Sequence, residues 1–135
     1  MRTLPVRTFK IVVPVQPADI DERAHVNNTV YLRWIQEVAA AHWRNLASAA
    51  AREAVSWVVL RHEIDYTSPA VLGDDVELET WVGKATRLTF ERFTHIRRKA
   101  DGQLLCKART LWCPVDPRTG RPVRVSAGVR EQFST

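Results

Sequence analysis

The spacing of apolar residues divides the chain into one helical segment and several extended segments. Residues 28–46 carry apolar side chains at helical spacing, and the alanines at 39–41 add helix propensity. Asn27 or Asn28 is a suitable N-cap, because an asparagine side chain accepts hydrogen bonds from the free N–H groups of a first turn. The pattern therefore predicts one long helix over residues 28–46, about 28 Å in length.

Extended segments flank this helix, and residues typical of turns separate them. We expect a strand over residues 7–14, a loop over 16–24, and a short terminal helix over 126–133 that Ser126 caps. Four more strands are predicted after the long helix, over residues 56–66, 76–82, 88–96 and 105–115. This order predicts an α+β fold with a mainly antiparallel sheet of five to six strands, long enough to wrap along the whole helix.

Alternation within the strands assigns side chains to the two faces of the sheet. The segment 56–66 alternates apolar with charged residues, as a half-buried strand does, and its apolar positions are Val58, Leu60, Ile64 and Tyr66. Trp57, Trp81 and Trp112 lie on strands with mixed faces. We expect them on the outer sheet surface, where they suit contacts between subunits, and the alternative is that they fill the core of one chain.

The composition is that of one globular domain over residues 1–135. Apolar residues make up 45% and charged residues 26%, and a chain of this size buries a core that is stable without a disulfide or a metal ion. No segment has the length and apolarity of a signal peptide or a membrane span, so we expect a cytoplasmic protein with no membrane partner. Cys106 and Cys113 share one predicted strand, about 23 Å apart, so they cannot pair, which fits a reducing compartment.

The net charge of +5 raises the question of nucleic-acid binding. The basic residues cluster weakly, because the one short run is Arg97-Arg98-Lys99 and the arginines at 118, 121 and 124 are spread across a turn. A solvated surface accounts for them better, and we expect no nucleic-acid partner. A modest positive field would still suit a small anionic ligand.

The segment before the long helix carries the candidate chemistry. It reads Asp19-Ile-Asp21-Glu-Arg-Ala-His25-Val-Asn27-Asn28-Thr-Val-Tyr31. This run resembles the motif of the hotdog-fold thioesterases of the 4-hydroxybenzoyl-CoA thioesterase type. A second run, from Arg61-His-Glu-Ile-Asp-Tyr66 through Ser68-Pro-Ala70 to Leu72-Gly-Asp74, resembles a further signature of that family, so the resemblance covers nearly the whole chain.

The resemblance implies a hotdog fold and hydrolysis of an acyl-CoA thioester, with Asp21 as the catalytic carboxylate. Asp21 would either attack the thioester carbonyl or activate a water, and both routes stay open. The backbone N–H of Asn28, at the positive end of the helix, is the implied oxyanion donor. His25 either contacts substrate or orders the loop, and Tyr31 either lines the acyl pocket or packs against the sheet.

Two other placements of the chemistry compete with Asp21. Glu37 lies on the helix, where some hotdog thioesterases carry their carboxylate, but Arg33 four residues earlier explains it as a surface ion pair. A hotdog hydratase or dehydratase would need an Asp-x-x-x-x-His dyad, whereas Asp21 and His25 are four apart. A module that binds acyl thioesters or lipids without cleaving them is the alternative outside enzymes.

The family pattern also sets expectations about cofactors, subunits and the loop. No His or Cys cluster has metal-ligand spacing, so we expect no metal and no cofactor other than the coenzyme A of the substrate. The resemblance implies a homodimer joined edge to edge, or a homotetramer. Ala24 stands where the family carries glycine, which argues against a strict requirement for positive φ there or implies an altered loop.

Overall fold

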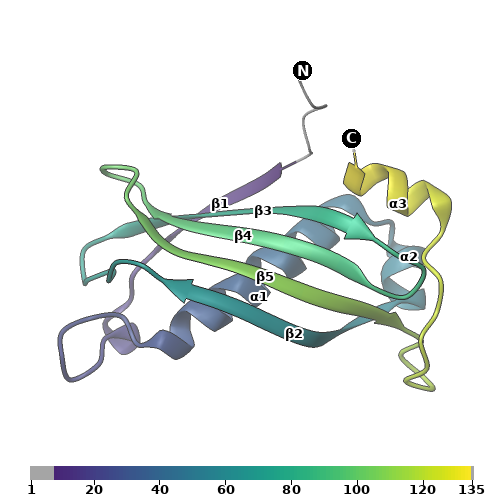
Figure 1. The fold of residues 1–135 in the computed structure, drawn as a ribbon, viewed down its shortest axis with the longest axis horizontal. Helices are drawn as coiled ribbons and strands as arrows, with labels where there is room; N and C mark the ends of the chain where they lie inside the picture. Colours follow the sequence, from purple (N-terminus) through teal and green to yellow (C-terminus); the bar gives the residue numbers. More distant parts are fainter. Residues whose placement is uncertain (1–7, 135) are drawn as a thin grey trace.

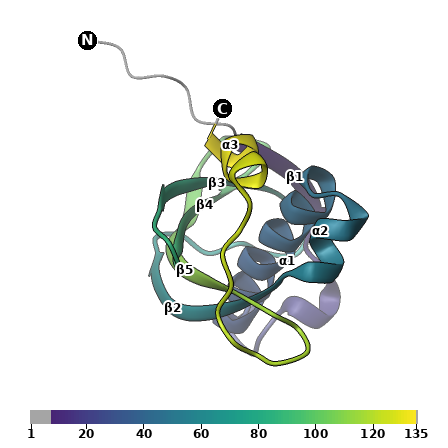
Figure 2. The ribbon, with the colours of Figure 1, turned by 90° about the vertical axis from the view of Figure 1, so that its right-hand side faces the viewer.

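Five strands form one antiparallel sheet that curves around a long helix (Figures 1 and 2). The structure, a computed structural model, describes residues 8–134. The sheet has the order β1-β3-β4-β5-β2, with β1 (Thr8–Pro14), β2 (Ser56–Tyr66), β3 (Asp75–Ala85), β4 (Phe90–Arg98) and β5 (Leu104–Val115). Its helices are α1 (Asn28–Leu46), α2 (Ala49–Ala54) and α3 (Ala127–Ser134). The arrangement confirms the predicted α+β hotdog architecture.

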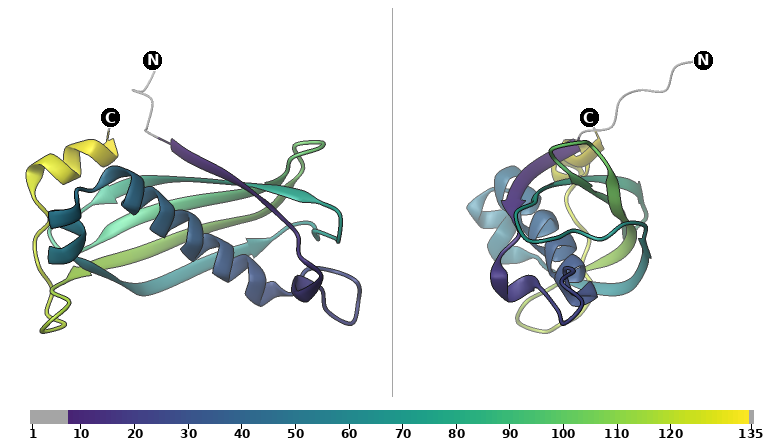
Figure 3. Two further views of the ribbon diagram at one scale, coloured as in Figure 1. Left: turned by 180° about the vertical axis from the view of Figure 1, so that it is seen from behind. Right: turned by 90° about the vertical axis from the view of Figure 1, so that its left-hand side faces the viewer.

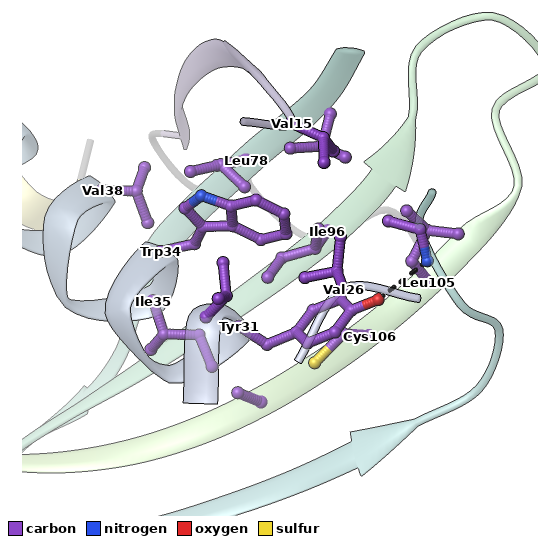
Figure 4. Close-up of a cluster of buried hydrophobic side chains, with 14 residues drawn as sticks. Val15, Val26, Tyr31, Trp34, Ile35, Val38, Leu78, Ile96, Leu105 and Cys106 are labelled. Atoms are coloured by element: carbon purple, nitrogen blue, oxygen red, sulfur yellow. Dashed lines mark hydrogen bonds between the residues drawn. The ribbon is translucent and has the colours of Figure 1, made fainter. Parts of the chain in front are cut away.

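Helix α1 has the predicted limits and supplies the centre of the core. Asn27 is its N-cap, since the Asn27 side chain accepts a hydrogen bond of 2.9 Å from the Thr29 N–H. Trp34, Ile35 and Val38 are almost fully buried against the inner face of the sheet, as Figure 4 shows. The helix packs closer to β1 and β3 than to β2, so the inner face of β2 is only half covered.

A register shift between Val59 and Arg61 changes the faces of β2. Before the shift, Trp57 and Val59 face inward, whereas Val58 and Leu60 are exposed at 46% and 56%. The simple alternation is therefore wrong for the first half of this strand. A β-bulge inserts one residue and so inverts the side-chain pattern on one side of it, which strict two-residue periodicity cannot represent.

The three tryptophans of the strands do not share one face of the sheet. Trp57 and Trp112 pack in a second cluster of apolar side chains beneath α3, together with Phe90 and Phe133, so their predicted place on the outer surface is wrong. Trp81 does lie on the outer face, where it stacks on Phe93 with ring centroids 5.7 Å apart. Two of the three tryptophans thus belong to the core of one chain.

Other limits differ from the sequence-based expectation by a few residues. The third strand extends to Ala85, and the fourth begins at Phe90 because Thr86 and Thr89 close a turn. Helix α2 was not expected, since six residues that bury no side chain leave no apolar period to detect. Ser126 caps α3 as predicted, with its hydroxyl accepting from the Val129 N–H.

Both cysteines lie buried on β5 as free thiols, in agreement with the sequence argument. Burial raises the pKa of the Cys106 thiol to about 12, which keeps it protonated. Within residues 8–134, no helix combines the length and apolarity needed to cross a membrane.

Candidate active site

The loop before α1 fixes the Asp21 carboxylate through backbone groups. Its Oδ1 accepts hydrogen bonds from the N–H groups of Arg23 at 2.9 Å and His25 at 3.3 Å. The Asp21 N–H donates to the His25 carbonyl at 2.8 Å, and the Ala24 N–H donates to the Asp21 carbonyl at 3.1 Å. Among the described residues no group hydrogen-bonds Oδ2, so one carboxylate oxygen is held in place and the other is available for chemistry.

Ala24 closes this loop in the left-handed conformation, with φ of +61°. Of the two alternatives stated for this position, the absence of a strict requirement for positive φ is wrong, because Ala24 itself has a positive φ, and an altered loop stays a prediction. The hydrogen bonds on both sides of Ala24, at Arg23 and His25, force the tight turn, and the loop adopts it despite the clash of the Cβ atom with the backbone. Ala24 therefore adopts, at the expense of local strain, a conformation that glycine takes without it.

Asp19 anchors the same loop to α1, a role that the sequence did not reveal. Its side chain is buried, accepting from the Gln16 N–H at 2.8 Å and from the Arg33 guanidinium at 3.0 Å. Its carbonyl accepts from the Asn27 N–H at 2.9 Å. The first aspartate of the Asp-x-Asp pair was the available signal, but its partner Arg33 lies fourteen residues away, beyond any local pattern.

Glu37 forms the expected surface ion pair. Its carboxylate lies 3.2 Å from Arg33 Nε, one helical turn away, and its side chain is 49% exposed. Arg33 thus joins Asp19 and Glu37, which supports a structural role for Glu37.

An open cleft of about 500 Å³ lies at the N-terminal end of α1. The structure brings together in its lining all four residues predicted from the motif: Asp21, His25, Asn28 and Tyr31. Two further lining residues, Arg23 and Tyr66, were not singled out from the sequence. Arg23 adds a positive charge beside Asp21. Tyr66 is the last residue of β2, and only the folded sheet brings it next to the loop that carries Asp21.

The first turn of α1 borders this cleft and has an N–H group without an acceptor in the described residues. Asn28 is the first helical residue, and its N–H has no acceptor within residues 8–134, whereas the Thr29 N–H is satisfied by the Asn27 side chain. The positive end of the helix dipole adds to this donor. A carboxylate and a helix N-terminus that line one cleft can act on an electrophilic carbonyl and on the negative charge that develops on its oxygen.

Tyr31 is a packing and positioning residue at the base of the cleft. Its side chain is 2% exposed, and its hydroxyl accepts from the buried Ala70 N–H at 2.9 Å, the dashed line in Figure 4. The ring contacts Trp34 and Tyr66 edge to face. Burial raises the pKa of Tyr31, so the hydroxyl stays neutral. His25, in contrast, orders the loop through its backbone, and its half-buried side chain borders the cleft.

Within the described part of the chain, no group of three or more His, Cys, Asp or Glu side chains is arranged to hold a metal ion. The four histidines stay apart: His62 contacts Thr110, and His42 contacts Arg92.

Comparison with known proteins identifies the family. A family model described as the thioesterase-like superfamily matches residues 15–133. The chain belongs to this superfamily. The resemblance carried by the Asp21 motif is thereby confirmed, and the site described above is the candidate active site of a thioesterase-like protein.

Sequence relatives of this thioesterase-like chain include plant enzymes. The chain is 26% identical over 133 residues to the chloroplastic oleoyl-acyl carrier protein thioesterase 2 of Arabidopsis thaliana, across 92% of this chain and 36% of that protein. The chain thus spans about a third or less of the length of the curated relatives that it matches.

Solved structures share the thioesterase-like fold at low identity. A 1,4-dihydroxy-2-naphthoyl-CoA thioesterase from Synechocystis superposes with a TM-score of 0.80 at 18% identity, covering 94% of this chain and 96% of that one. A thioesterase from Thermus thermophilus, solved with coenzyme A and Zn, gives 0.83 at 23% identity, covering 97% and 100%.

Proposed function

We propose that the protein hydrolyses acyl-CoA thioesters to the free acid and coenzyme A, with Asp21 as the catalytic carboxylate. The observation that carries the proposal is that Asp21 lines the same cleft as Asn28, the first residue of α1, whose N–H has no acceptor in the described residues. Membership of the thioesterase-like superfamily supports the class of reaction. The family alone does not assign the roles of individual residues, which rest on the geometry of the cleft.

Asp21 acts through its unpaired Oδ2 atom, either on the thioester carbon or on a water that attacks it. In both routes the carbonyl oxygen gains negative charge, which the Asn28 N–H and the helix dipole stabilise. Tyr31 and His25 position the cleft walls. The reaction needs a carboxylate, a water and a hydrogen-bond donor, so we propose no cofactor beyond the coenzyme A of the substrate.

Coenzyme A is the proposed carrier of the acyl group. The Thermus thermophilus structure, which contains coenzyme A, supports this choice, whereas the plant relative acts on acyl carrier protein. Arg23 is exposed on the rim of the cleft and is our candidate for contact with a CoA phosphate. The unpaired cysteines are compatible with a reducing compartment, and we propose a cytoplasmic setting.

We also propose a homodimer, or a tetramer built from two such dimers, joined through the edge strand β2. This strand lies at one end of the sheet and exposes Val58, Leu60 and Tyr66. An exposed apolar edge strand is a template for pairing with a second chain. Because Tyr66 also borders the cleft, a partner at this edge would lie close to the substrate.

The role of Asp21 is tested by following thiol release from a panel of acyl-CoAs. An Asp21→Asn variant should lose at least ~10²-fold in kcat, since it retains the shape but not the base. The exposed neighbour Glu22→Gln is the matched control, and Glu37→Gln tests the other placement; both should keep wild-type rates. Unchanged turnover by Asp21→Asn would exclude the assignment, and absence of turnover by the wild type would favour a non-catalytic binding module.

The role of the Asn28 N–H is tested by replacing the residue with proline. Proline is tolerated as the first residue of a helix but has no N–H, and Asn27 already has the extended conformation that a following proline needs, with φ of −60° and ψ of 140°. Asn28→Pro should therefore fold and lose about 10²-fold or more in kcat. Asn28→Ala, which keeps the N–H, is the control. Equal rates for the two variants would show that this donor is not used.

A further inference from the structure

The loop that connects β1 to α1 closes on itself as a short antiparallel ladder of two arms, residues 19–21 and residues 25–27. The paired groups are the Asn27 N–H with the Asp19 carbonyl at 2.9 Å, the Asp21 N–H with the His25 carbonyl at 2.8 Å, and Ile20 with Val26 in a β-bridge. Figure 3 shows this loop at the N-terminal end of α1. Because the Asp21 carboxylate is on the first arm and the N-cap of α1 is on the second, the ladder sets the position of the carboxylate relative to the helix N-terminus.

The second arm of the ladder is held by the rest of the fold. Val26 is buried, and its N–H donates to the Ala70 carbonyl at 2.9 Å. Asn27 caps α1 through its hydrogen bond from the Thr29 N–H. A two-stranded hairpin is only marginally stable on its own in water, so the first arm needs an attachment of its own to stay paired.

The first arm is attached to α1 through the Asp19 carboxylate. This side chain is 3% exposed, and its Oδ2 accepts from the Gln16 N–H at 2.8 Å, whereas its Oδ1 accepts from Arg33 Nη2 at 3.0 Å. Arg33 lies in the second turn of α1, so this bond joins the first arm to the helix that begins at Asn28. Ile20 adds an apolar contact with the core. A buried carboxylate that loses its cation keeps the cost of its desolvation, so this pair contributes more than an exposed one.

Neither partner of this ion pair lines the cleft. Asp19 and Arg33 therefore act on a bound substrate only through the groups that they hold in place. The proposed reaction needs the Asp21 carboxylate at the carbon and the Asn28 N–H at the oxygen of one carbonyl group. A displacement of about 1 Å between reacting groups can lower a rate about 10²-fold, so a ladder that opens would impair the reaction without removing any group that takes part in it.

We propose that Asp19 and Arg33 are positioning residues of the thioester hydrolysis. Their ion pair holds the first arm against α1 and so keeps the Asp21 carboxylate aligned with the helix N-terminus. The inference rests on the proposed function, since it takes Asp21 as the catalytic carboxylate. It also gives the two aspartates of the Asp-x-Asp pair different tasks, because Asp19 binds the helix while Asp21 faces the substrate.

The kinetic test compares Arg33→Gln with Glu37→Gln by thiol release from acyl-CoAs. Arg33→Gln should fold, because the Arg33 side chain is 50% exposed. It should lower kcat about tenfold or more and leave KM within about twofold of the wild type, since Arg33 does not line the cleft. Glu37→Gln removes only the exposed ion pair of Arg33 and should keep the wild-type kcat. Arg33→Lys keeps the charge and should recover part of the loss. An unchanged kcat in Arg33→Gln would overturn the proposal.

Combining Arg33→Gln with Asp21→Asn separates positioning from other causes of a lower rate. A variant that acts through the position of the Asp21 carboxylate has little further effect once that carboxylate is gone, so the two losses in kcat should combine to less than their product. A loss that arises elsewhere in the protein would multiply in full. Full multiplication would therefore also overturn the proposal.

Amide hydrogen exchange, followed by NMR, tests the attachment of the loop without any turnover. The ladder protects the N–H groups of Asp21 and Asn27, and their exchange in Arg33→Gln should accelerate about tenfold or more, because the lost hydrogen bond joins two charged groups. Exchange in Glu37→Gln should match the wild type. Unchanged exchange in Arg33→Gln would overturn the proposal. An inactive wild type in which Arg33→Gln still accelerates exchange would instead refute the hydrolysis and not the attachment.

Discussion

Replacing Ala24 with glycine should stabilise the protein. Ala24 holds a φ of +61° in the loop that fixes Asp21, and its side chain is exposed. The change removes one methyl group that makes no buried contact. The backbone N–H that donates to the Asp21 carbonyl is retained, so the hydrogen bonds of the loop stay in place.

The magnitude follows from two opposing effects. The left-handed conformation costs an L-residue roughly 1–2 kcal/mol, which glycine does not incur. Glycine gains conformational entropy in the unfolded chain, which opposes folding by about 0.4–1 kcal/mol. The net stabilisation is therefore about 0.5–1 kcal/mol, which corresponds to a rise in Tm of about 2–4 °C for a domain of this length.

Thermal and urea unfolding of the Ala24→Gly variant give the measurement. Ala100→Gly is the matched control, because Ala100 is also an exposed alanine in a turn but does not have a positive φ. Glycine at Ala100 should lower the free energy of unfolding, so the two variants should shift Tm in opposite directions. A loss of stability at Ala24, of the size found at Ala100, would refute the left-handed strain. Turnover by Ala24→Gly should equal that of the wild type, since the Asp21 contacts persist.

Two further predictions concern buried polar groups. Tyr31→Phe removes the acceptor of the buried Ala70 N–H and should lower the free energy of unfolding in urea by about 1–3 kcal/mol. The control Tyr66→Phe loses an exposed hydrogen bond of 3.4 Å and should lower it by less than about 0.5 kcal/mol. Similar losses for the two variants would contradict the anchoring role of Tyr31. Burial lowers the pKa of His62, so below its usual value of about 6.5 the unfolded chain binds more protons than the folded one. Stability should therefore fall as the pH drops from 7.5 to 5.5, and the Tm of His62→Gln should fall less over this range than the Tm of the wild type. An equally steep fall in Tm for the variant would contradict this.

The sequence predicted the fold wherever periodicity was regular. The limits of α1 agree with the prediction because apolar residues recur at helical spacing from its N-cap to its last turn. The limits of β2 also agree, and turn residues follow this strand directly. The faces of β2 could not be predicted, since a bulge near Leu60 depends on pairing with residues of β5 that lie fifty or more positions further along the chain. Trp57 was misplaced for that reason.

The candidate site was predictable to the extent that its motif is local. Asp21, His25 and Asn28 lie within one short run, and the cap geometry of α1 follows from Asn27. Contacts that hold the site together are distant in sequence, as the Tyr31 bond to Ala70 spans thirty-nine residues. Only the folded chain reveals such pairs.

The hydrogen bonds that hold Asp21 leave the neighbouring side chains free to vary. The donors to its carboxylate are backbone N–H groups, which every residue but proline possesses, and the side chains of Glu22 and Arg23 are exposed. Substitutions at Arg23, which lines the cleft, can change the charge at its mouth, and hence which carrier or headgroup is accepted, without moving the carboxylate. The loop is thus a place where new substrate preferences can be acquired in single steps.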